Sequence, residues 1–337
     1  YDFIGSLDEI RISKVTRSAD WVKLQHENQK PLQTLVGPVV QAGSIRRYAN
    51  AGFADLESVL GLYLQDEGQP QVAGVCVAAA GPVRDGVASM TNLDWTITGP
   101  GLTAATGTSH TAILNDLQAQ GHALGRIAPQ HLRPVIAGPS KPGAAMLVVG
   151  LGTGMNAAPV HETPWGRVVA ASECGHISMP VRTEEDHRLA QFVAHVGPHA
   201  HGFAGVEDVL AGRGLDRVYA FVAHEAGLET TKRGAEIMAD VAAGEALAAR
   251  AVQLYIHLLG QELGNLALVH LPFGGIYLIG GVARAMQPYF DQMELTRHFR
   301  DKGRFAEFMG NFAVTIVEDD YAALTGCAAY LAGGGKG

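Results

Sequence analysis

The stretch AAMLVVGLGTGMN, residues 144–156, joins an apolar run to a glycine-rich turn. Two other apolar runs end in the same way: VAGVCVAAA (72–80) leads into Gly81-Pro82, and GIYLIG (275–280) runs into a glycine pair. Short apolar runs without alternation are typical of strands that are covered on both faces. Strand, glycine turn and helix, repeated along a chain, indicate parallel strands joined by crossover helices. The sequence therefore predicts an α/β protein.

Two further segments fit this pattern. Apolar residues recur at helical spacing between Phe53 and Leu64, which predicts one amphipathic helix. A short apolar run, Ala112 to Leu114, predicts another strand directly before a polar Asn-Asp pair.

The composition favours a two-lobed globular protein with a small-molecule partner. At 337 residues and 47% apolar content, the chain is long enough to bury two cores. Its net charge of −8 argues against a nucleic-acid or membrane surface, because both need clustered Lys and Arg. No apolar stretch reaches the roughly 20 residues that span a bilayer. Three widely spaced cysteines suggest neither a disulfide framework nor a Cys-based zinc site, so we expect a cytoplasmic protein.

Residues 1–37 differ in character from the rest of the chain. Apolar residues including Ile10 and Ile12 predict a short strand, and residues 18–29 a short helix. The run GSLDEIRISKVTRSADWVKLQHENQKP (5–31) resembles the closing strand and tail of a concanavalin-type jelly-roll domain. One strand cannot form a jelly roll, so we expect it to pack on the following lobe, pair with another chain, or stay loosely ordered. Because the chain also opens without a methionine, we interpret this segment as foreign or replaced.

The glycine loops are candidate phosphate-binding elements. GLGTGMN, residues 150–156, offers successive backbone N–H groups and the Thr153 hydroxyl at the end of a strand. A dinucleotide fingerprint would need glycine at Met155, and a P-loop would end in Gly-Lys-Ser/Thr, so neither familiar motif is present. The pair Gly280-Gly281 would let the backbone approach a base or ribose. A tight turn without any ligand is the alternative for both loops.

Asn115 and Asp116 follow the predicted strand at 112–114, which is where α/β sheets present ligands. A carboxylate there can take the proton of a sugar hydroxyl during attack on phosphorus, and the amide can orient a neighbouring hydroxyl. A simple Asn-Asp turn or helix cap is the alternative.

Two later segments carry side chains that suit vicinal hydroxyls. ASECGHISM contains Glu173 and His176, and GVEDVLAGRGL contains Glu207. In the alternative, the histidine is a satisfied core residue and Glu207 a solvated residue in the first turn of a helix. A local cluster of three histidines, 195, 199 and 201, lacks the cysteine or paired carboxylate that would support zinc, so we expect no metal site there.

In this order the segments resemble the bacterial glucokinases of the hexokinase-actin superfamily over residues 44–333. The resemblance is carried by these stretches: CVAAAGPV, MTNLDW, ILNDLQAQ, VVGLGTGM, ECGH, VEDVLAGRGL, GNLAL, IYLIGGVA, KGRF and LTGCAAYL. It implies a two-lobed actin-like ATPase fold, similar to ribonuclease H, with an incomplete N-terminal lobe. Residues 38–110 with 318–337 would form the small lobe, and residues 111–317 the large lobe.

The resemblance also implies roles for single residues. Asp116 looks like the catalytic base, and the residues that look like ligands of the sugar hydroxyls are Asn115, Glu173, His176 and Glu207. The residues implied to bind ATP are Gly152, Thr153 and Gly154 at the phosphates and Gly280 and Gly281 near the adenosine. The family resemblance further implies ATP with Mg²⁺ as phosphoryl donor, glucose as acceptor at its 6-hydroxyl, and a homodimer as a plausible assembly.

One departure from the family pattern leaves two hypotheses open. The family's opening strand carries an Asp-x-Gly-Gly-Thr-Asn turn that contacts phosphate and magnesium, whereas this chain reads TLVGPVVQAGS at 34–44. The first hypothesis is an ATP-dependent glucose kinase. The second is an inactive sugar-binding or regulatory protein that reads hydroxyls but lacks the first phosphate loop.

Overall fold

The computed structural model describes residues 10–12, 45–90, 94–197 and 200–333, and the chain divides into two compact units. The first unit contains Tyr1–Ala128 and Asp319–Gly337, and the second contains Pro129–Glu318. The sequence places the change of lobe near residue 110, whereas residues 111–128 belong to the first unit. They do so because the strand Thr111–Asn115 pairs in parallel with Val75–Ala79.

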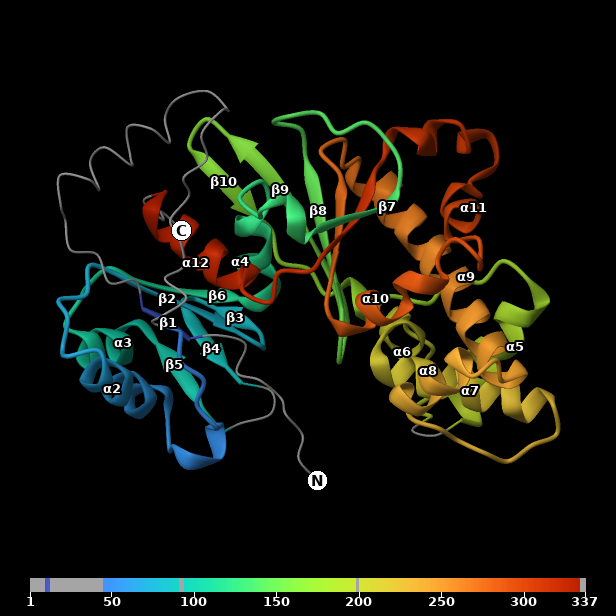
Figure 1. Ribbon diagram of the computed structural model, residues 1–337, viewed down its shortest axis with the longest axis horizontal. Coiled ribbons are helices and arrows are strands. Elements are labelled where there is room, and N and C mark those ends of the chain that lie inside the picture. Colours follow the sequence, from blue (N-terminus) through green and yellow to red (C-terminus); the bar gives the residue numbers. More distant parts are fainter. Residues whose placement is uncertain (1–9, 13–44, 91–93, 198–199, 334–337) are drawn as a thin grey trace. The chain divides into compact units, whose positions relative to one another are not determined.

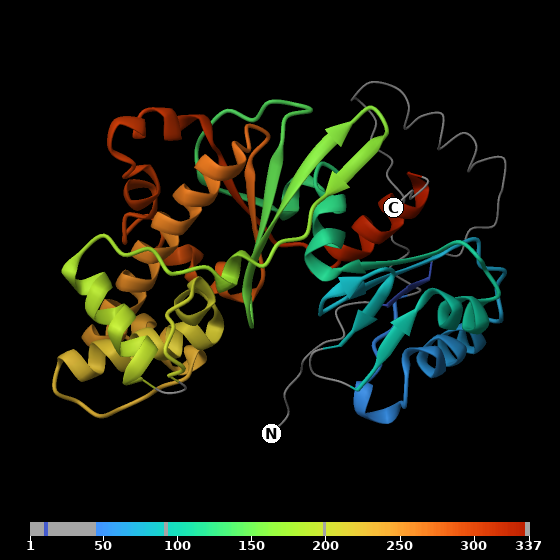
Figure 2. The same ribbon diagram turned by 180° about the vertical axis from the view of Figure 1, so that it is seen from behind.

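The first unit contains two three-stranded sheets and two pairs of helices (Figures 1 and 2). Its strands are β1 (Ile10–Ile12), β2 (Val75–Ala79), β3 (Val83–Arg84), β4 (Val87–Ser89), β5 (Thr96–Thr98) and β6 (Thr111–Asn115). Its helices are η2 (Asn50–Gly52), α2 (Leu56–Asp66), α3 (Gly99–Thr106), α4 (Asp116–Ala123) and α12 (Ala322–Ala332). The sheets have the orders β1-β2-β6 and β3-β4-β5.

Side chains of the central strand β2 alternate between two cores. Val75 and Val77 pack with Leu60 of α2 and with residues of α3, β4 and β5. Cys76 packs on the other face, in a smaller cluster with residues of α4 and α12 such as Cys327. Because successive side chains of a strand point to opposite faces, an unbroken apolar run fits this doubly covered position.

The helix predicted between residues 53 and 64 is confirmed as α2. The side chain of Asp55 caps it by accepting the backbone N–H of Ser58 at 2.8 Å. Its buried residues, Leu56, Val59, Leu60 and Leu64, form the apolar stripe that the spacing predicts.

The strand predicted around Ile10 and Ile12 is also present. It is β1, which pairs antiparallel with β2 and places Ile10 opposite Val77 and Ile12 opposite Val75. The remainder of residues 1–37, including the predicted helix at 18–29 and most of the run that resembles a jelly roll, lies outside the described residues.

The second unit is built on a mixed sheet of order β10-β9-β8-β11-β12-β7. Its strands are β7 (Leu132–Ile136), β8 (Met146–Leu151), β9 (Met155–Thr163), β10 (Gly166–Val169), β11 (Ile276–Ile279) and β12 (Val314–Val317). β8, β11 and β12 are parallel neighbours, whereas β9, β10 and β7 each pair antiparallel.

The element that follows β8 differs from the one predicted from the sequence. The repeated pattern of strand, glycine turn and helix predicts a helix there, but Gly150–Gly154 leads into the antiparallel strand β9. The turn after β2 likewise leads into strands, and only Gly280-Gly281 opens a helix. Buried side chains such as Met155, Ala157 and Val160 let β9 continue the sheet.

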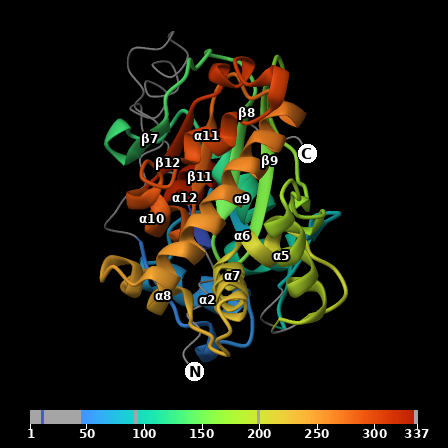
Figure 3. The same ribbon diagram turned by 90° about the vertical axis from the view of Figure 1, so that its right-hand side faces the viewer.

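Helices of the second unit surround a central long helix, α9, which lies in front of the sheet in Figure 3. The helices are η3 (Pro129–His131), η4 (Cys174–His176), α5 (Glu184–His195), α6 (Val206–Leu210), α7 (Gly212–Glu225), α8 (Gly234–Ala242), α9 (Ala246–His270), α10 (Gly281–Met286), η5 (Gln287–Tyr289), α11 (Leu295–Arg300), η6 (Gly303–Phe305) and η7 (Phe308–Asn311). One apolar core joins α9 to the sheet and to α7 and α11. Within the described ranges, no helix combines the length and apolar character needed to cross a membrane.

Candidate active site

The glycine turn between β8 and β9 is held by backbone contacts. Gly152 donates its N–H to the carbonyl of Gly154 at 3.0 Å, and its own carbonyl accepts the N–H of Gly212 at 2.8 Å. The turn is thereby tied to the start of α7. A Cβ atom added at Gly152 would meet no atom within 4 Å, so this side of the turn is open to a ligand.

The second glycine segment adjoins the first. β11 pairs in parallel with β8, so both strands end at the same edge of the sheet. Gly280 has a φ of 103°, and a Cβ atom there would collide with the carbonyl oxygen of Leu151. Only glycine suits this position, because its backbone is left-handed and lies against the first turn. A cradle formed by two glycine segments suits a phosphate-bearing ligand.

The segment that carries Glu173 and His176 packs on this glycine turn. A Cβ atom at Gly175 would collide with the carbonyl oxygen of Met155 and would lie 3.3 Å from Cβ of Glu207. Side-chain bonds from Asn156 fix the segment further: its Oδ1 accepts the N–H of Cys174 at 3.1 Å, and its Nδ2 donates to Glu173 Oε2 at 3.4 Å. The structure thus brings three predicted site segments together in the second unit.

Glu173 and His176 present their side chains to solvent. Their side chains are 72% and 70% exposed, and Glu173 Oε2 lies 4.0 Å from His176 Nε2. The histidine is therefore not a satisfied core residue. A carboxylate and an imidazole side by side can accept and donate hydrogen bonds to neighbouring hydroxyls.

Glu207 lies in the first turn of α6 but is not simply solvated. Its Oε2 accepts the backbone N–H of Met155 at 3.0 Å, and its Oε1 lies 3.6 Å from Nη2 of Arg213. A Cβ atom at Gly154 would come within 2.6 Å of Oε2, so the carboxylate lies directly against the turn. Glu207 therefore touches both the glycine turn and an arginine.

Asn115 and Asp116 lie in the first unit, at the end of β6. Asn115 caps α4: its Oδ1 accepts the N–H of Leu117 at 3.0 Å, and the side chain of Gln118 completes a capping box. Its Nδ2 donates to the carbonyl of Gly81 at 3.1 Å. The helix cap that was the alternative interpretation of this pair is thus present, and it fixes the orientation of the amide. Asp116 is the first residue of α4, where a negative charge suits the helix dipole.

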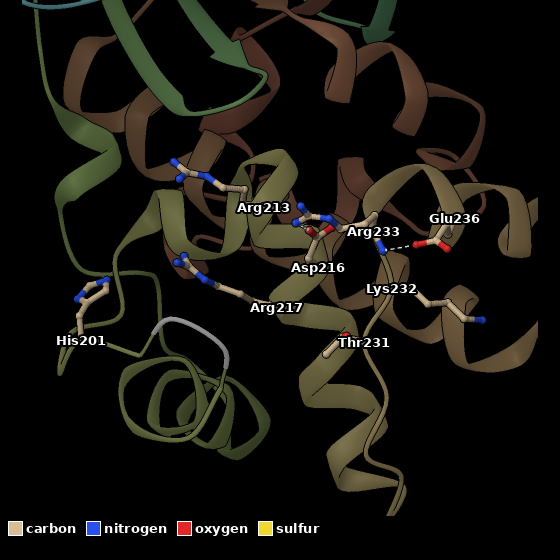
Figure 4. Close-up of a pocket in the computed structure, with 8 residues that line it drawn as sticks. All are labelled: His201, Arg213, Asp216, Arg217, Thr231, Lys232, Arg233 and Glu236. Carbon is tan, nitrogen blue, oxygen red and sulfur yellow. Dashed lines mark hydrogen bonds and ion pairs between the residues drawn. The ribbon is translucent and has the colours of Figure 1, made fainter. Parts of the chain in front are cut away.

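A basic pocket of about 520 Å³ lies in the second unit (Figure 4). Its lining residues are His201, Arg213, Asp216, Arg217, Thr231, Lys232, Arg233 and Glu236. Several cations pair with carboxylates: Arg233 reaches Asp216 at 3.1 Å, and Arg217 bonds Asp208. One of the lining residues, Arg213, follows Gly212, whose backbone N–H donates to the carbonyl of Gly152 in the glycine turn. An excess of guanidinium and ammonium groups suits a phosphate-bearing ligand.

Of the histidine cluster, His201 lines this pocket and lies 3.4 Å from Asp208, whereas His199 is outside the described residues. Among the residues placed by the structure, no group of three or more potential metal ligands comes together.

A protein-family model described as Glucokinase matches residues 31–333. The chain belongs to the glucokinase family. The match extends through residues 34–44, where the family's expected phosphate motif is not found in this sequence. The comparisons give the jelly-roll resemblance of the opening residues no support.

Relatives in the glucokinase family cover most of the chain. The glucokinase of Chromobacterium violaceum is 31% identical over 293 residues, which are 84% of this chain and 81% of the relative. The glucokinase of Yersinia pestis is 30% identical over 298 residues, which are 88% and 90% of the two chains.

Solved structures confirm the predicted fold of a two-lobed, actin-like sugar kinase. The glucokinase from an Antarctic psychrotroph superposes with a TM-score of 0.77 at 27% identity, covering 85% of this chain and 88% of that one. The Balamuthia mandrillaris glucokinase in complex with glucose gives 0.70 at 21% identity, covering 82% of each chain. At this lower identity, the likeness concerns the fold alone.

Sequence reasoning did not single out Asn156 and Arg213, which the structure places beside the candidate site residues Glu173 and Glu207. Asn156 is the last residue of GLGTGMN, and its side chain accepts hydrogen bonds from Ser172 and Cys174, which lie 16 and 18 residues further along the chain. Arg213 stands in the GRGL stretch, and the run TTKRGAE at 230–236 was the only further sign of a basic pocket.

Proposed function

We propose that this chain is an ATP-dependent glucokinase that transfers the γ-phosphoryl group of ATP to the 6-hydroxyl of glucose. One observation carries the proposal: Glu207 accepts the N–H of Met155 directly after the glycine turn Gly152–Gly154, and the segment of Glu173 and His176 packs on the same residue through Gly175. Groups that bind hydroxyls therefore adjoin groups that suit phosphates. Membership of the glucokinase family and the relatives named glucokinase support the same activity.

Asp116 is the proposed catalytic base. Its carboxylate would accept the proton of the 6-hydroxyl as that oxygen forms its bond to the γ-phosphorus, while the bond from phosphorus to the β–γ bridging oxygen breaks and ADP leaves. Asn115, whose amide is oriented by its bonds to Gly81 and Leu117, is the proposed ligand of an adjacent hydroxyl. Glu173, His176 and Glu207 are the other proposed sugar ligands.

The proposed nucleotide ligands are the backbone at Gly152–Gly154 with the Thr153 hydroxyl, and Gly280-Gly281 near the adenosine. A fold neighbour, the Streptomyces griseus ROK-family glucokinase, is described in complex with glucose and AMPPNP. The basic pocket adds cationic side chains next to the same turn. Mg²⁺ would offset the charge of the phosphates; such an ion is usually held by one or two carboxylates together with the substrate phosphates, and it keeps several waters.

The test is a coupled assay of glucose-dependent ADP release. The wild-type protein is expected to be active, and Asp116→Asn to lower kcat by about 10²- to 10⁴-fold, because the base is lost while the shape is kept. Calorimetry of the variant with glucose serves as control and should give near wild-type affinity. Full activity of Asp116→Asn, or an inactive wild-type protein that is folded, would contradict the proposal.

A second candidate function is a sugar-binding or regulatory protein without phosphoryl transfer. The observation that favours it is the sequence TLVGPVVQAGS at 34–44, which has neither the acid nor the Gly-Gly-Thr-Asn of the family turn. Calorimetry separates the two candidates. This one predicts binding of glucose without measurable affinity for Mg-ATP, so tight Mg-ATP binding excludes it.

A cytoplasmic location and a homodimer complete the proposal. No disulfide joins the three cysteines, Cys76, Cys174 and Cys327, which suits a reducing compartment. Light scattering after size-exclusion chromatography would measure the mass of the assembly.

A further inference from the structure

The two carboxylate oxygens of Glu207 have different partners. Oε2 accepts the N–H of Met155 at 3.0 Å, which ties this oxygen to the glycine turn. Oε1 faces the guanidinium of Arg213 at 3.6 Å. If Glu207 is a sugar ligand, Oε1 is the oxygen with more capacity for a hydroxyl, and a cation already stands beside it.

Arg213 is the most weakly held of the pocket cations. Its 3.6 Å ion pair is longer than the 3.1 Å pair of Arg233 with Asp216, and longer than those of Arg217 and Lys232 with their own aspartates. Its side chain is 62% exposed, and Figure 4 shows its guanidinium apart from the Arg233–Asp216 pair. A long, exposed ion pair contributes little free energy, so a phosphate can displace the carboxylate.

We propose that Arg213 is a positioning residue that couples anion binding in the basic pocket to sugar binding at Glu207. Without nucleotide, Arg213 pairs with Oε1 and competes with the sugar hydroxyl. A phosphate-bearing ligand in the pocket draws the guanidinium away, because guanidinium binds phosphate through two parallel hydrogen bonds. Oε1 then accepts the hydroxyl. This inference rests on the proposed function, since it takes Glu207 as a sugar ligand and the pocket as part of the nucleotide site.

Calorimetric titration with glucose tests this coupling in the wild-type protein and in Arg213→Gln. Without nucleotide, the variant is expected to bind glucose about two- to fivefold more tightly, as expected from the loss of a competing exposed ion pair. Saturating AMPPNP with Mg²⁺ should tighten glucose binding by the wild-type protein about fivefold or more. The same addition should change glucose binding by the variant less than about twofold, because no guanidinium remains to be displaced.

Arg188→Gln is the matched control. It removes the same charge from the same unit, but Arg188 lies outside the pocket lining and pairs with Glu225 at 2.8 Å. We expect it to keep both the wild-type glucose affinity and the response to saturating AMPPNP. Thermal unfolding of all three proteins checks that they are folded, and a merely structural role of Arg213 would not tighten glucose binding.

Three results would overturn the inference: unchanged or weaker glucose binding by Arg213→Gln, a full AMPPNP response in that variant, or an equal loss of response in Arg188→Gln. If the wild-type protein phosphorylates glucose, any of these three results overturns the inference but leaves the proposed function intact. A wild-type protein that binds no glucose contradicts both, because Glu207 would then not be a sugar ligand.

Discussion

Glu262 is a buried carboxylic acid in the middle of α9. Glu262 is only 1% exposed. Its Oε2 accepts a hydrogen bond from the side-chain amide of Asn265 at 3.1 Å. Its Oε1 has no hydrogen-bond partner among the described residues. Burial raises the pKa of Glu262 to about 7, although the bond from Asn265 and the charge of Lys302 oppose this shift. The folded protein therefore holds this proton more tightly than the unfolded chain.

The sign of this effect gives a prediction for Glu262→Gln. Between the usual pKa of 4.5 and the folded value of about 7, the folded state keeps a proton that the unfolded state has lost. The contribution of Glu262 to the free energy of unfolding therefore falls as pH rises through that window. Because glutamine does not titrate, the variant lacks this loss of stability. Its free energy of unfolding relative to that of the wild-type protein should therefore rise with pH by up to roughly 3 kcal/mol.

Urea denaturation at pH 5, 6, 7 and 8 would measure this difference between the two proteins. A difference that stays constant over this range would show that Glu262 does not titrate there in the folded protein.

Single site residues could be predicted where their chemistry is visible in the sequence. The polar residues of ECGH and VEDVL stand out, and the structure brings their two segments together in one unit, where both contact Met155 directly after the glycine turn. Asn156 and Arg213 could not be predicted, because each acts through a partner that only folding brings near.

At the scale of elements, the closest helix contact of the first unit is between α12 and α4. A Cβ atom added at Gly326 of α12 would collide with the carbonyl oxygen of Ala119 in α4. The smaller apolar cluster with Cys76 and Cys327 lies at the same contact. α4 also begins at Asn115 and Asp116, so this contact supports the element that carries the proposed base.

We predict that Gly326→Ala destabilises the protein by about 1–3 kcal/mol, because the methyl group forces the two helices apart. Gly61→Ala is the matched control: Gly61 lies on the exposed side of α2, where an added Cβ meets nothing within 4 Å. The control should be neutral or stabilise by up to about 1 kcal/mol through helix propensity. Chemical denaturation of both variants measures the difference, and equal stabilities would disprove the tight contact.

Elements with a strong period were predictable, and the connection after β8 was not. α2 carries a helical apolar stripe and β2 an unbroken apolar run, and sequence alone locates both. The turn at Gly150–Gly154 does not indicate whether a strand or a helix comes next. A glycine turn permits either a hairpin or a crossover, and the choice depends on the sheet that receives β9.

At the scale of the whole molecule, the proposed reaction draws on residues of both units. The first unit supplies Asn115 and Asp116, and the second supplies the glycine segments and the other proposed sugar ligands. The change of unit at Ala128 rather than near residue 110 could not be predicted, because it depends on the pairing of β6 with β2. The family and the two-lobed fold were recognisable from the order of short motifs along the chain.

The most direct test of this account is the identity and amount of product formed from glucose and Mg-ATP. The purified protein should yield glucose 6-phosphate and ADP in equal amounts, measured by mass spectrometry. Asp116→Asn should yield both at a rate about 10²- to 10⁴-fold lower. ADP without sugar phosphate, or no product from a folded protein that binds glucose, would contradict the claim that the chain is a glucokinase.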